Sequence, residues 1–516
     1  MVGATNGTWA PVPARSVRGE MLMKDDSVSP PPSSRSIFFT IYPSVALPMF
    51  LAVVDQTIVA TALPAIAATL GSVERVSWVV VSYLVAGTIA APVYGFLRDI
   101  YGGRRMMFLA LGVYTFASLL CAVSTSVEML SLARVLQGLG GGGLMTLSQS
   151  LIGETVPPRD RARYQGYLAA VLVTSSTFGP VAGGYLTHHL GWRSVFLVNL
   201  PLAVLAAVLT FRLPSRAPRD QPWTFDSIGL ALFIAFIVPA LLALERAQRM
   251  TAAIVPVVVL LASIAIVSLV ALLRRERKAP FPLFPITLLR QPTIWRSDAL
   301  AACHGAALVS LVSFLPLYLR AVRGSSASET GLLLLPLMFG IGIGSMITGR
   351  SVSRTGLTAI FPSVGLIFAT LGVGVFALSA ETLGPKGLAM VLFSIGLCMG
   401  TVMGVVQVTV QNVAGSASLG SAAASVQLSR SIGAASGTAL VGAIVFATLT
   451  LSNPDAVPIL RALIERGPDA LASLSDEHRS VLQEDIATAF RTGFLTIAVF
   501  TASGVALAWS IPSRRL

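Results

Sequence analysis

Fourteen separate stretches of this chain are apolar over the roughly 20 residues that a helix needs to cross the hydrocarbon core of a bilayer. They lie at about 38–64, 77–97, 106–125, 128–151, 164–187, 192–211, 227–244, 254–273, 297–318, 331–349, 358–379, 387–409, 423–449 and 489–511. Lipid offers no partner to a free backbone N–H or C=O, so a spanning stretch without a closed barrel must be helical. We therefore predict an all-α membrane protein with fourteen transmembrane helices.

The basic residues orient this chain in the membrane. If the N-terminus is cytoplasmic, 23 of the 36 lysines and arginines lie on the cytoplasmic side and 11 on the other side. Positive residues gather in the cytoplasmic loops of membrane proteins. We expect both termini in the cytoplasm and the chain in the cell (inner or plasma) membrane. Loop orientation then accounts for the net charge of +13, and we expect no nucleic-acid partner.

An internal repeat divides the apolar stretches into two halves. The loop GFLRDIYG has Gly95 and Gly102 seven residues apart, and the loop GRSVSRTG has Gly349 and Gly356 at the same spacing. Further pairs at the same offset of 254 residues are Gly179 with Gly433 and Gly183 with Gly437. Duplicated bundles are a common membrane architecture. We predict two pseudo-repeated six-helix bundles plus two inserted helices.

These features set the expected domain boundaries. The Pro/Ser-rich segment 1–36 is expected to be a disordered cytoplasmic tail. The remaining parts are an N-terminal six-helix bundle over 37–211, a linker with two extra helices over 212–278, a C-terminal six-helix bundle over 279–511 and a cytoplasmic C-terminus over 512–516. Spaced leucines and valines in 450–488 predict amphipathic helices in an outer loop.

The first apolar stretch reads LAVVDQTIVATALPAI and resembles the Asp-x-Thr-Ile-Val-Asn-x-Ala-Leu-Pro signature of the fourteen-helix drug:proton antiporter branch of the major facilitator superfamily. The matching residues are Asp55, Thr57, Ile58, Val59, Ala62, Leu63 and Pro64, whereas Ala60 replaces the usual Asn. The resemblance covers nearly the whole chain after residue 36. It implies a secondary transporter that works by alternating access.

The loop GFLRDIYGGRR is similar to the cytoplasmic Gly-x-Leu-x-Asp-Arg-x-Gly-Arg-Arg motif of this superfamily. The residues expected to control the conformation here are Gly95, Asp99, Gly102, Arg104 and Arg105, although Ile100 replaces the usual Arg. Asp99 could cap the next helix or pair with arginines of the facing bundle. Such a latch would favour the state whose cytoplasmic side is closed. The alternative is a basic loop that merely obeys the charge rule.

Two glycine motifs follow. RVLQGLGGGG in the fourth stretch resembles the Arg-x-x-Gln-Gly-x-Gly motif of the family, with Arg134 and Gln137 in the matching places. No Gly-Lys-Ser/Thr follows these glycines, which argues against a built-in ATPase. GPVAGG in the fifth stretch is similar to the antiporter motif of exporters and supplies a candidate bending point at Gly179, Pro180, Gly183 and Gly184. Simple helix packing is the alternative for these glycines.

Asp55 is the one acid deep inside an apolar stretch. A charge at membrane depth is costly and marks a functional residue by default. By helical rise, Asp55 and Arg134 lie at comparable depths, ~14 Å and ~9 Å from the outer face. We hypothesise that they interact directly or through water, and that their competition exchanges a proton for substrate. A static buried ion pair is the alternative.

Other polar residues within apolar stretches are candidates for lining a substrate cavity: Gln56, Gln137, His304 and Arg430. His304 titrates in a useful range but is more often a packing residue when alone on a helix. Arg430 could equally extend its head group to the cytoplasmic surface.

The sequence thus predicts a secondary active transporter, and not an enzyme, that exports amphipathic small molecules (multidrug efflux) by proton antiport. We expect no cofactor and no metal, with protons as the coupling ion. A dedicated exporter of a metabolite, siderophore or lipid stays open, and a membrane-embedded enzyme or receptor is the alternative of another class. The resemblance also makes a periplasmic adaptor protein a candidate partner.

Overall fold

Helices build the described part of this protein. The computed structural model describes residues 37–71, 75–215, 224–247, 254–283, 286–460 and 476–515. The first half comprises η1 (Ile37–Ile41), α2 (Tyr42–Leu70), α3 (Trp78–Tyr101), α4 (Gly103–Ala122), α5 (Val127–Thr155), α6 (Pro158–Leu190), α7 (Ser194–Leu197) and α8 (Asn199–Thr210). Two helices follow, α9 (Ser227–Ala247) and α10 (Val255–Glu276). The second half comprises α11 (Ile286–Leu289), α12 (Pro292–Ala321), α13 (Ala327–Thr355), α14 (Ile360–Ser379), α15 (Pro385–Met399), α16 (Met403–Ala414), α17 (Leu419–Ser452) and α19 (Asp476–Ser510).

In the part of the chain that the structure describes, 11 helical segments are long and apolar enough to cross a membrane. Three expected spans fall short of that measure. Helix α5 contains Glu128, Arg134 and a run of glycines, and α6 begins with several charged residues. The sixth expected span is split into α7 and α8. All three nevertheless pack along the apolar helices of the first half.

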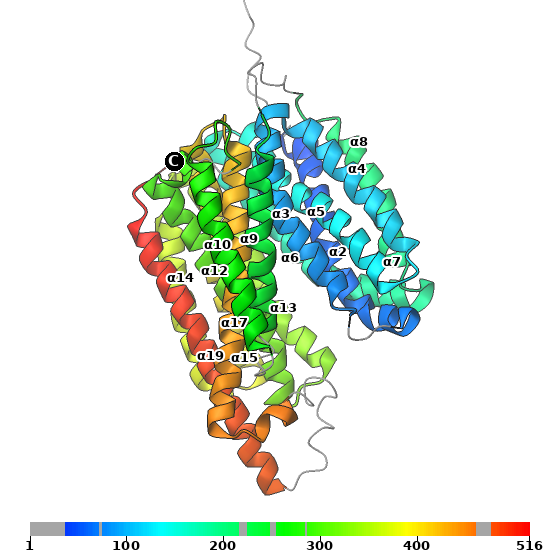
Figure 1. Ribbon diagram of the computed structural model, residues 1–516. Coiled ribbons are helices and arrows are strands. Elements are labelled where there is room, and N and C mark those ends of the chain that lie inside the picture. Colours follow the sequence, from blue (N-terminus) through cyan, green and yellow to red (C-terminus); the bar gives the residue numbers. More distant parts are fainter. Residues whose placement is uncertain are drawn as a thin grey trace, which may run out of the picture.

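Figure 1 shows the two halves as separate bundles that meet at one end of the molecule and diverge toward the other. The described start of α2 lies at the end where they meet, as does the C-terminus. The hairpin of α9 and α10 packs on both halves at their junction, because Ile89 of α3 and Ile432 of α17 pack against the buried cluster that contains Phe233. The two inserted helices are the least buried spans, which is expected for helices that face lipid.

The repeated glycines occupy equivalent places in the two halves. Gly102 ends α3 and Gly356 ends α13, each with a positive φ, of 88° and 70°, that a residue with a Cβ rarely adopts. Seven residues earlier, Gly95 packs against Gly420 of α17, and Gly349 packs against Ala162 of α6. Each bundle therefore approaches the other through the same kind of glycine contact.

The second glycine pair packs equivalent helices inside each bundle. Gly179 and Gly183 bring α6 onto α2, and Gly433 and Gly437 bring α17 onto α12. A side chain at any of these places would collide with the facing helix, so the glycines permit close backbone contact, as is common between membrane helices.

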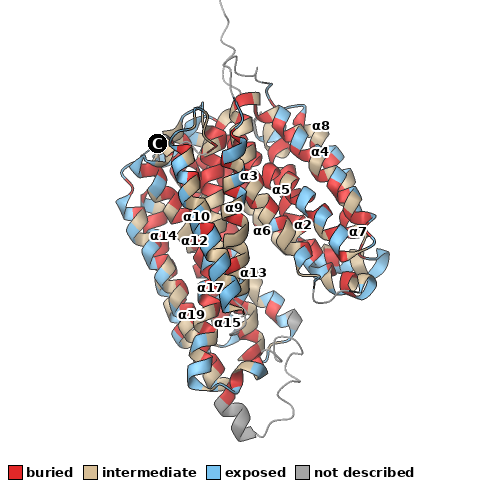
Figure 2. Ribbon diagram, in the orientation of Figure 1, coloured by how far each residue is buried: buried red, intermediate tan, exposed pale blue. Residues whose placement is uncertain are grey.

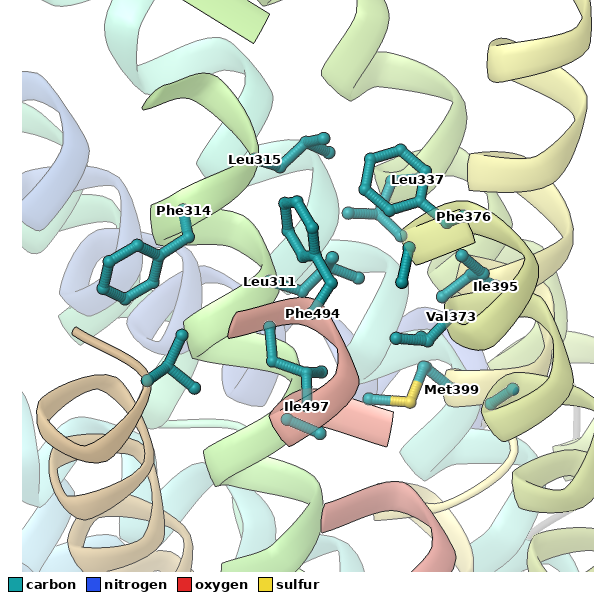
Figure 3. Packing of buried hydrophobic residues seen from close by; sticks show 14 of the residues in the cluster. Leu311, Phe314, Leu315, Leu337, Val373, Phe376, Ile395, Met399, Phe494 and Ile497 are labelled. Carbon is teal, nitrogen blue, oxygen red and sulfur yellow. The ribbon is translucent and has the colours of Figure 1, made fainter. Parts of the chain in front are cut away.

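Each bundle has its own apolar core. Figure 3 shows the core of the second half, where Phe376 and Phe494 pack edge to face at 4.8 Å between ring centroids. Buried residues lie between the helices, and exposed ones gather on the outer surfaces and at the helix ends (Figure 2).

The outer segment 450–488 differs in part from its prediction as separate amphipathic helices. Residues 476–488 form the first part of α19 without a break, so that this last helix is longer than the apolar stretch 489–511 alone. Ala456 and Leu460 are buried against the second core. The remaining residues of this segment, 461–475, lie outside the described residues, as does the expected tail 1–36.

Candidate functional site

The contact between the bundles centres on Asp99. We call the end of the molecule that holds the α3–α4 loop (Gly102) and the α13–α14 loop (356–359) the basic end. The Asp99 carboxylate accepts hydrogen bonds from the backbone N–H of Gly420 at 2.8 Å and of Ser421 at 2.9 Å, and a third from the Ser421 hydroxyl at 2.9 Å. These two residues begin α17 in the other bundle. Asp99 therefore satisfies the free N–H groups at that helix N-terminus, where a negative charge is also favoured.

The sequence predicted that Asp99 caps the next helix or pairs with arginines of the facing bundle. The helix that it caps is instead α17 of the facing bundle, and its arginine partner is Arg98 of its own bundle. Arg98 donates to Asp99 at 2.9 Å and to Glu154 at 2.6 Å within its own bundle. Gly95 makes this approach possible, since a Cβ there would lie 2.6 Å from the Gly420 carbonyl oxygen. Neither of the two following arginines bridges the bundles: Arg104 stacks on Phe211 and bonds the Leu213 carbonyl, and Arg105 is exposed.

Further polar contacts join the bundles at the basic end. Arg161 donates to Asn412 at 2.7 Å, and Gln411 donates to the Gln149 carbonyl at 2.9 Å. Ser353, which the repeat pairs with Asp99, donates to Asp160 at 3.1 Å. The latch is therefore a set of hydrogen bonds from both halves.

Helix α6 shows where this contact stops. At the basic end, Ala162, Gly166 and Val173 of α6 pack against α13. By helical spacing the same stripe continues to Pro180 and Gly184. There Pro180 is exposed and nothing lies within 4 Å of where a Cβ of Gly184 would be. The GPVAGG motif thus has two faces. Gly179 and Gly183 pack on α2, while Pro180 and Gly184 lie on the face that contacts α13 nearer the basic end but not here.

A hydrogen-bonded network inside the first bundle surrounds Asp55. Its carboxylate pairs with the guanidinium of Arg134 directly, not through water, and both side chains are fully buried. The other carboxylate oxygen accepts from Gln137 at 3.0 Å and from Asn199 at 2.9 Å. Gln137 was expected to line a cavity, but it is fully buried and orients the Asp55 carboxylate instead. A buried ion pair needs such extra hydrogen bonds to offset desolvation.

Arg134 makes further contacts besides its pair with Asp55. Its Nε donates to the Val79 carbonyl at 3.1 Å, a second nitrogen donates to Gln137 at 2.7 Å, and the guanidinium lies 4.2 Å from the ring centroid of Tyr83. Sequence reasoning did not assign Asn199 to this site. The signal was present, because Asn199 is an amide inside the apolar sixth stretch.

The remaining candidates are not among the residues that bond the Asp55 carboxylate. His304 on α12 is buried, with Nε2 3.0 Å from the Met399 carbonyl oxygen. Arg430 on α17 is partly exposed, and its Nε contacts Gln427 at 3.4 Å. Gln56 is partly buried and donates to the backbone of its own helix. Asp298 on α12 is also buried, and its carboxylate accepts a hydrogen bond from the Ser425 hydroxyl at 3.3 Å.

Asp226, at the basic end just before α9, lies outside the membrane-spanning segments. Its carboxylate accepts hydrogen bonds from the backbone N–H of Gly229 at 2.9 Å and from Arg275 at 3.2 Å. Burial acts to raise the pKa of Asp226, but these two donors outweigh it, and the pKa lies below its ordinary value. This ion pair ties α9 to α10. Among the described residues no cluster of His, Cys, Asp and Glu could hold a metal ion.

The chain is similar in sequence and in fold to known transporters. The family model described as "Major Facilitator Superfamily" matches residues 45–438. An uncharacterized MFS-type transporter, Rv1877 of Mycobacterium tuberculosis, is 34% identical over 86% of this chain, and the match spans 63% of that protein's length. The multidrug transporter protein MdtP of Bacillus subtilis is 29% identical over 86% of this chain and 81% of its own. The crystal structure of the human organic anion transporter MFSD10 is similar in fold, with a TM-score of 0.63 at 16% identity over 92% of this chain and 100% of that one.

Proposed function

The chain belongs to the major facilitator superfamily, and we propose that it exports amphipathic small molecules from the cell in exchange for protons. It is a transporter and a multi-pass membrane protein rather than an enzyme. The observation that carries the proposal is the fully buried Asp55–Arg134 pair, which lies in the bundle that contributes Asp99 to the contact at the basic end.

Proton exchange at Asp55 would act through its pair with Arg134. A proton on the carboxylate removes its charge and leaves Arg134 without a counter-ion, so that the two protonation states favour different packing of α2 and α5. Helix α2 packs on α6 through Gly179 and Gly183, and α6 carries the basic-end contact with α13. Protonation inside the first bundle would therefore bias the contact between the bundles.

We propose that the basic end is cytoplasmic, with fourteen spans and both termini on that side. The 11 apolar helical segments, together with α5, α6 and the α7–α8 pair, give this number. In that orientation the present conformation has its cytoplasmic side closed by the Asp99 contacts. A proton entering the cell supplies about 2.3 kcal/mol per 100 mV of membrane potential.

The substrate is proposed to be an amphipathic compound that is neutral, acidic or singly cationic. Beyond Val173 the exposed side chains of α6 include the large apolar Phe178, Val181 and Tyr185, besides the polar Thr174, His188 and His189. Asp55 is neutralised by Arg134, and Asp298 is buried, so neither offers a free negative charge to a dication in this conformation. The multidrug name of the Bacillus subtilis relative supports the substrate class by analogy.

The proposal can be tested with everted membrane vesicles from an efflux-deficient bacterium that expresses the chain. A proton gradient is set up, amphipathic compounds are added singly, and a pH-sensitive dye reports proton efflux. We expect some compounds to dissipate the gradient with the wild type and none to do so with Asp55→Asn.

Asp298→Asn is the matched control, because it neutralises the buried acid of the other bundle. It should keep the response. If Asp298→Asn abolished coupling and Asp55→Asn kept it, the proton carrier would be in the second bundle and the proposal would be wrong. No response to any compound, with unchanged drug susceptibility of the host, would contradict multidrug efflux and favour a dedicated exporter of a metabolite, siderophore or lipid.

A further inference from the structure

An apolar groove of about 590 Å³ runs along the side of the first bundle at the basic end. Its walls come from α2, α6 and the end of α8, and its lining residues include Tyr42, Ala46, Phe50, Tyr167 and Leu209. Along α2 the groove extends from Tyr42 to Phe50, which is ~12 Å of helix, close to the ~15 Å of one hydrocarbon leaflet.

Aromatic side chains surround the end of the groove nearest the loops. Phe38 of η1 stacks on Tyr42 at 5.4 Å and meets Tyr167 edge to face at 5.8 Å. Phe39 beside it is 66% exposed. Aromatic rings gather at the depth of lipid headgroups, with the apolar body toward the tails and any polar tip toward water. This arrangement places the end of the groove at the membrane interface.

Two arginines lie over the Tyr167 ring that forms the wall of the groove. The guanidinium of Arg163 is 5.6 Å from the ring centroid, and that of Arg350 is 5.5 Å away. Arg163 also donates to the Tyr167 hydroxyl at 2.7 Å. Neither arginine forms an ion pair with a carboxylate in the described ranges, and the neighbouring Asp160 accepts from Ser353.

We propose that this groove binds one anionic diacyl phospholipid, with an acyl chain along α2 and α6 and the phosphate at Arg163 and Arg350. Arginine is suited to this contact because its planar fork can donate two hydrogen bonds to a phosphate. A lipid, rather than a soluble anion, fits the combination of a leaflet-length apolar groove with charges only at its interfacial end.

The lipid would also affect the conformation, because its two arginines come from different bundles. Arg163 is on α6 and Arg350 is on α13. They lie over one ring only while the bundles touch at the basic end. A ligand that binds one conformation more tightly shifts the equilibrium toward it, so the lipid would stabilise the state seen here. This inference rests on the membrane placement in the proposed function but on neither its substrate nor its proton.

Native mass spectrometry of the full chain in detergent tests the binding directly. Dioleoylphosphatidylglycerol and dioleoylphosphatidylcholine are titrated separately, and the retained lipid is counted. With ~1 kcal/mol for each arginine at a membrane surface, two arginines should favour phosphatidylglycerol by about 30-fold. The double variant R163Q/R350Q should lose this preference. Arg354→Gln, one turn further along α13 and exposed, should keep it.

Two more measurements separate the sources of binding. Ala46→Trp, which fills the groove without changing charge, should weaken phosphatidylglycerol retention at least tenfold, and the soluble headgroup glycerophosphoglycerol should not compete. Each variant is first required to match the wild-type melting temperature in phosphatidylcholine. A preference that survives R163Q/R350Q, or competition by the headgroup alone, would overturn the proposal. So would full retention of phosphatidylglycerol by Ala46→Trp. None of these measurements requires transport, so they are independent of the proposed efflux.

Discussion

Replacing Asp99 by asparagine should open the basic end of this protein. The carboxylate accepts three hydrogen bonds from α17, at 2.8 to 2.9 Å. An amide oxygen can still accept from Gly420, but the amide NH₂ then faces the donors of Ser421, so two bonds to a charged group are lost. At ~1.5 kcal/mol or more for each such bond, the loss is about 3 kcal/mol. The equilibrium between closed and open basic ends should shift by on the order of 100-fold.

Electron paramagnetic resonance distances can measure this shift. Spin labels at the exposed Arg159 and Ser416 report the separation of the bundles at the basic end, in a background without the three cysteines. We expect a short distance in the wild type and a longer one in Asp99→Asn. Asp226→Asn is the control, because its partners, Gly229 and Arg275, belong to the inserted hairpin rather than to the bundle contact. A folded Asp99→Asn variant with the wild-type distance distribution would refute the role of these bonds.

Three further predictions follow from particular contacts. Arg134→Lys should reduce coupled transport at least ~10-fold in the vesicle assay, because an ammonium cannot bond Asp55, Gln137 and the Val79 carbonyl in the geometry of a guanidinium. Near-normal transport would contradict the role of this network. Gly183→Ala should lower the melting temperature by an amount equivalent to ~1–3 kcal/mol, since its Cβ would lie 2.6 Å from the Ile58 carbonyl oxygen. Gly184→Ala, where nothing lies within 4 Å of the added Cβ, should have little effect. Equal decreases in melting temperature would contradict the assignment of these glycines to two different faces of α6. The lowered pKa of Asp226 means that its ion pair stabilises the fold above the ordinary carboxyl range and that this contribution is lost as the pH falls below it; acid unfolding monitored by circular dichroism should therefore be less steep in Asp226→Asn.

Much of the helical architecture could be predicted, because each spanning helix corresponds to one continuous apolar stretch of the sequence. The predictions were least accurate where a helix depends on contacts with residues distant in the sequence. The spaced leucines and valines of 450–488 predict separate amphipathic helices, whereas α19 already begins at Asp476 and continues into the last span. This continuity depends on the packing of residues such as Leu482 and Ile486 against the second core. Hydropathy also undervalues α5, whose glycines and Arg134 are buried inside the bundle rather than exposed to lipid.

The sequence predicted the two charged residues of the candidate site, but not how the amide side chains bond them. Asp55 and Arg134 stand out because charges within apolar stretches are rare, and helical rise placed them at similar depth. Asn199 and the role of Gln137 depend on how three helices rotate toward one another, which no single stretch encodes. The partner of Asp99 was also beyond reach, since the N-terminus of α17 is more than 300 residues away in the sequence and presents only backbone groups.

Substrate-induced proton release by the purified protein tests the central claim most directly. The protein is solubilised in weakly buffered detergent solution with a pH indicator, and a compound that was active in the vesicle assay is added. If substrate and proton compete through the Asp55–Arg134 pair, the wild type and Asp298→Asn should each release protons on substrate binding, and Asp55→Asn should release none. Undiminished release by Asp55→Asn, with substrate bound as tightly as in the wild type, would contradict the account.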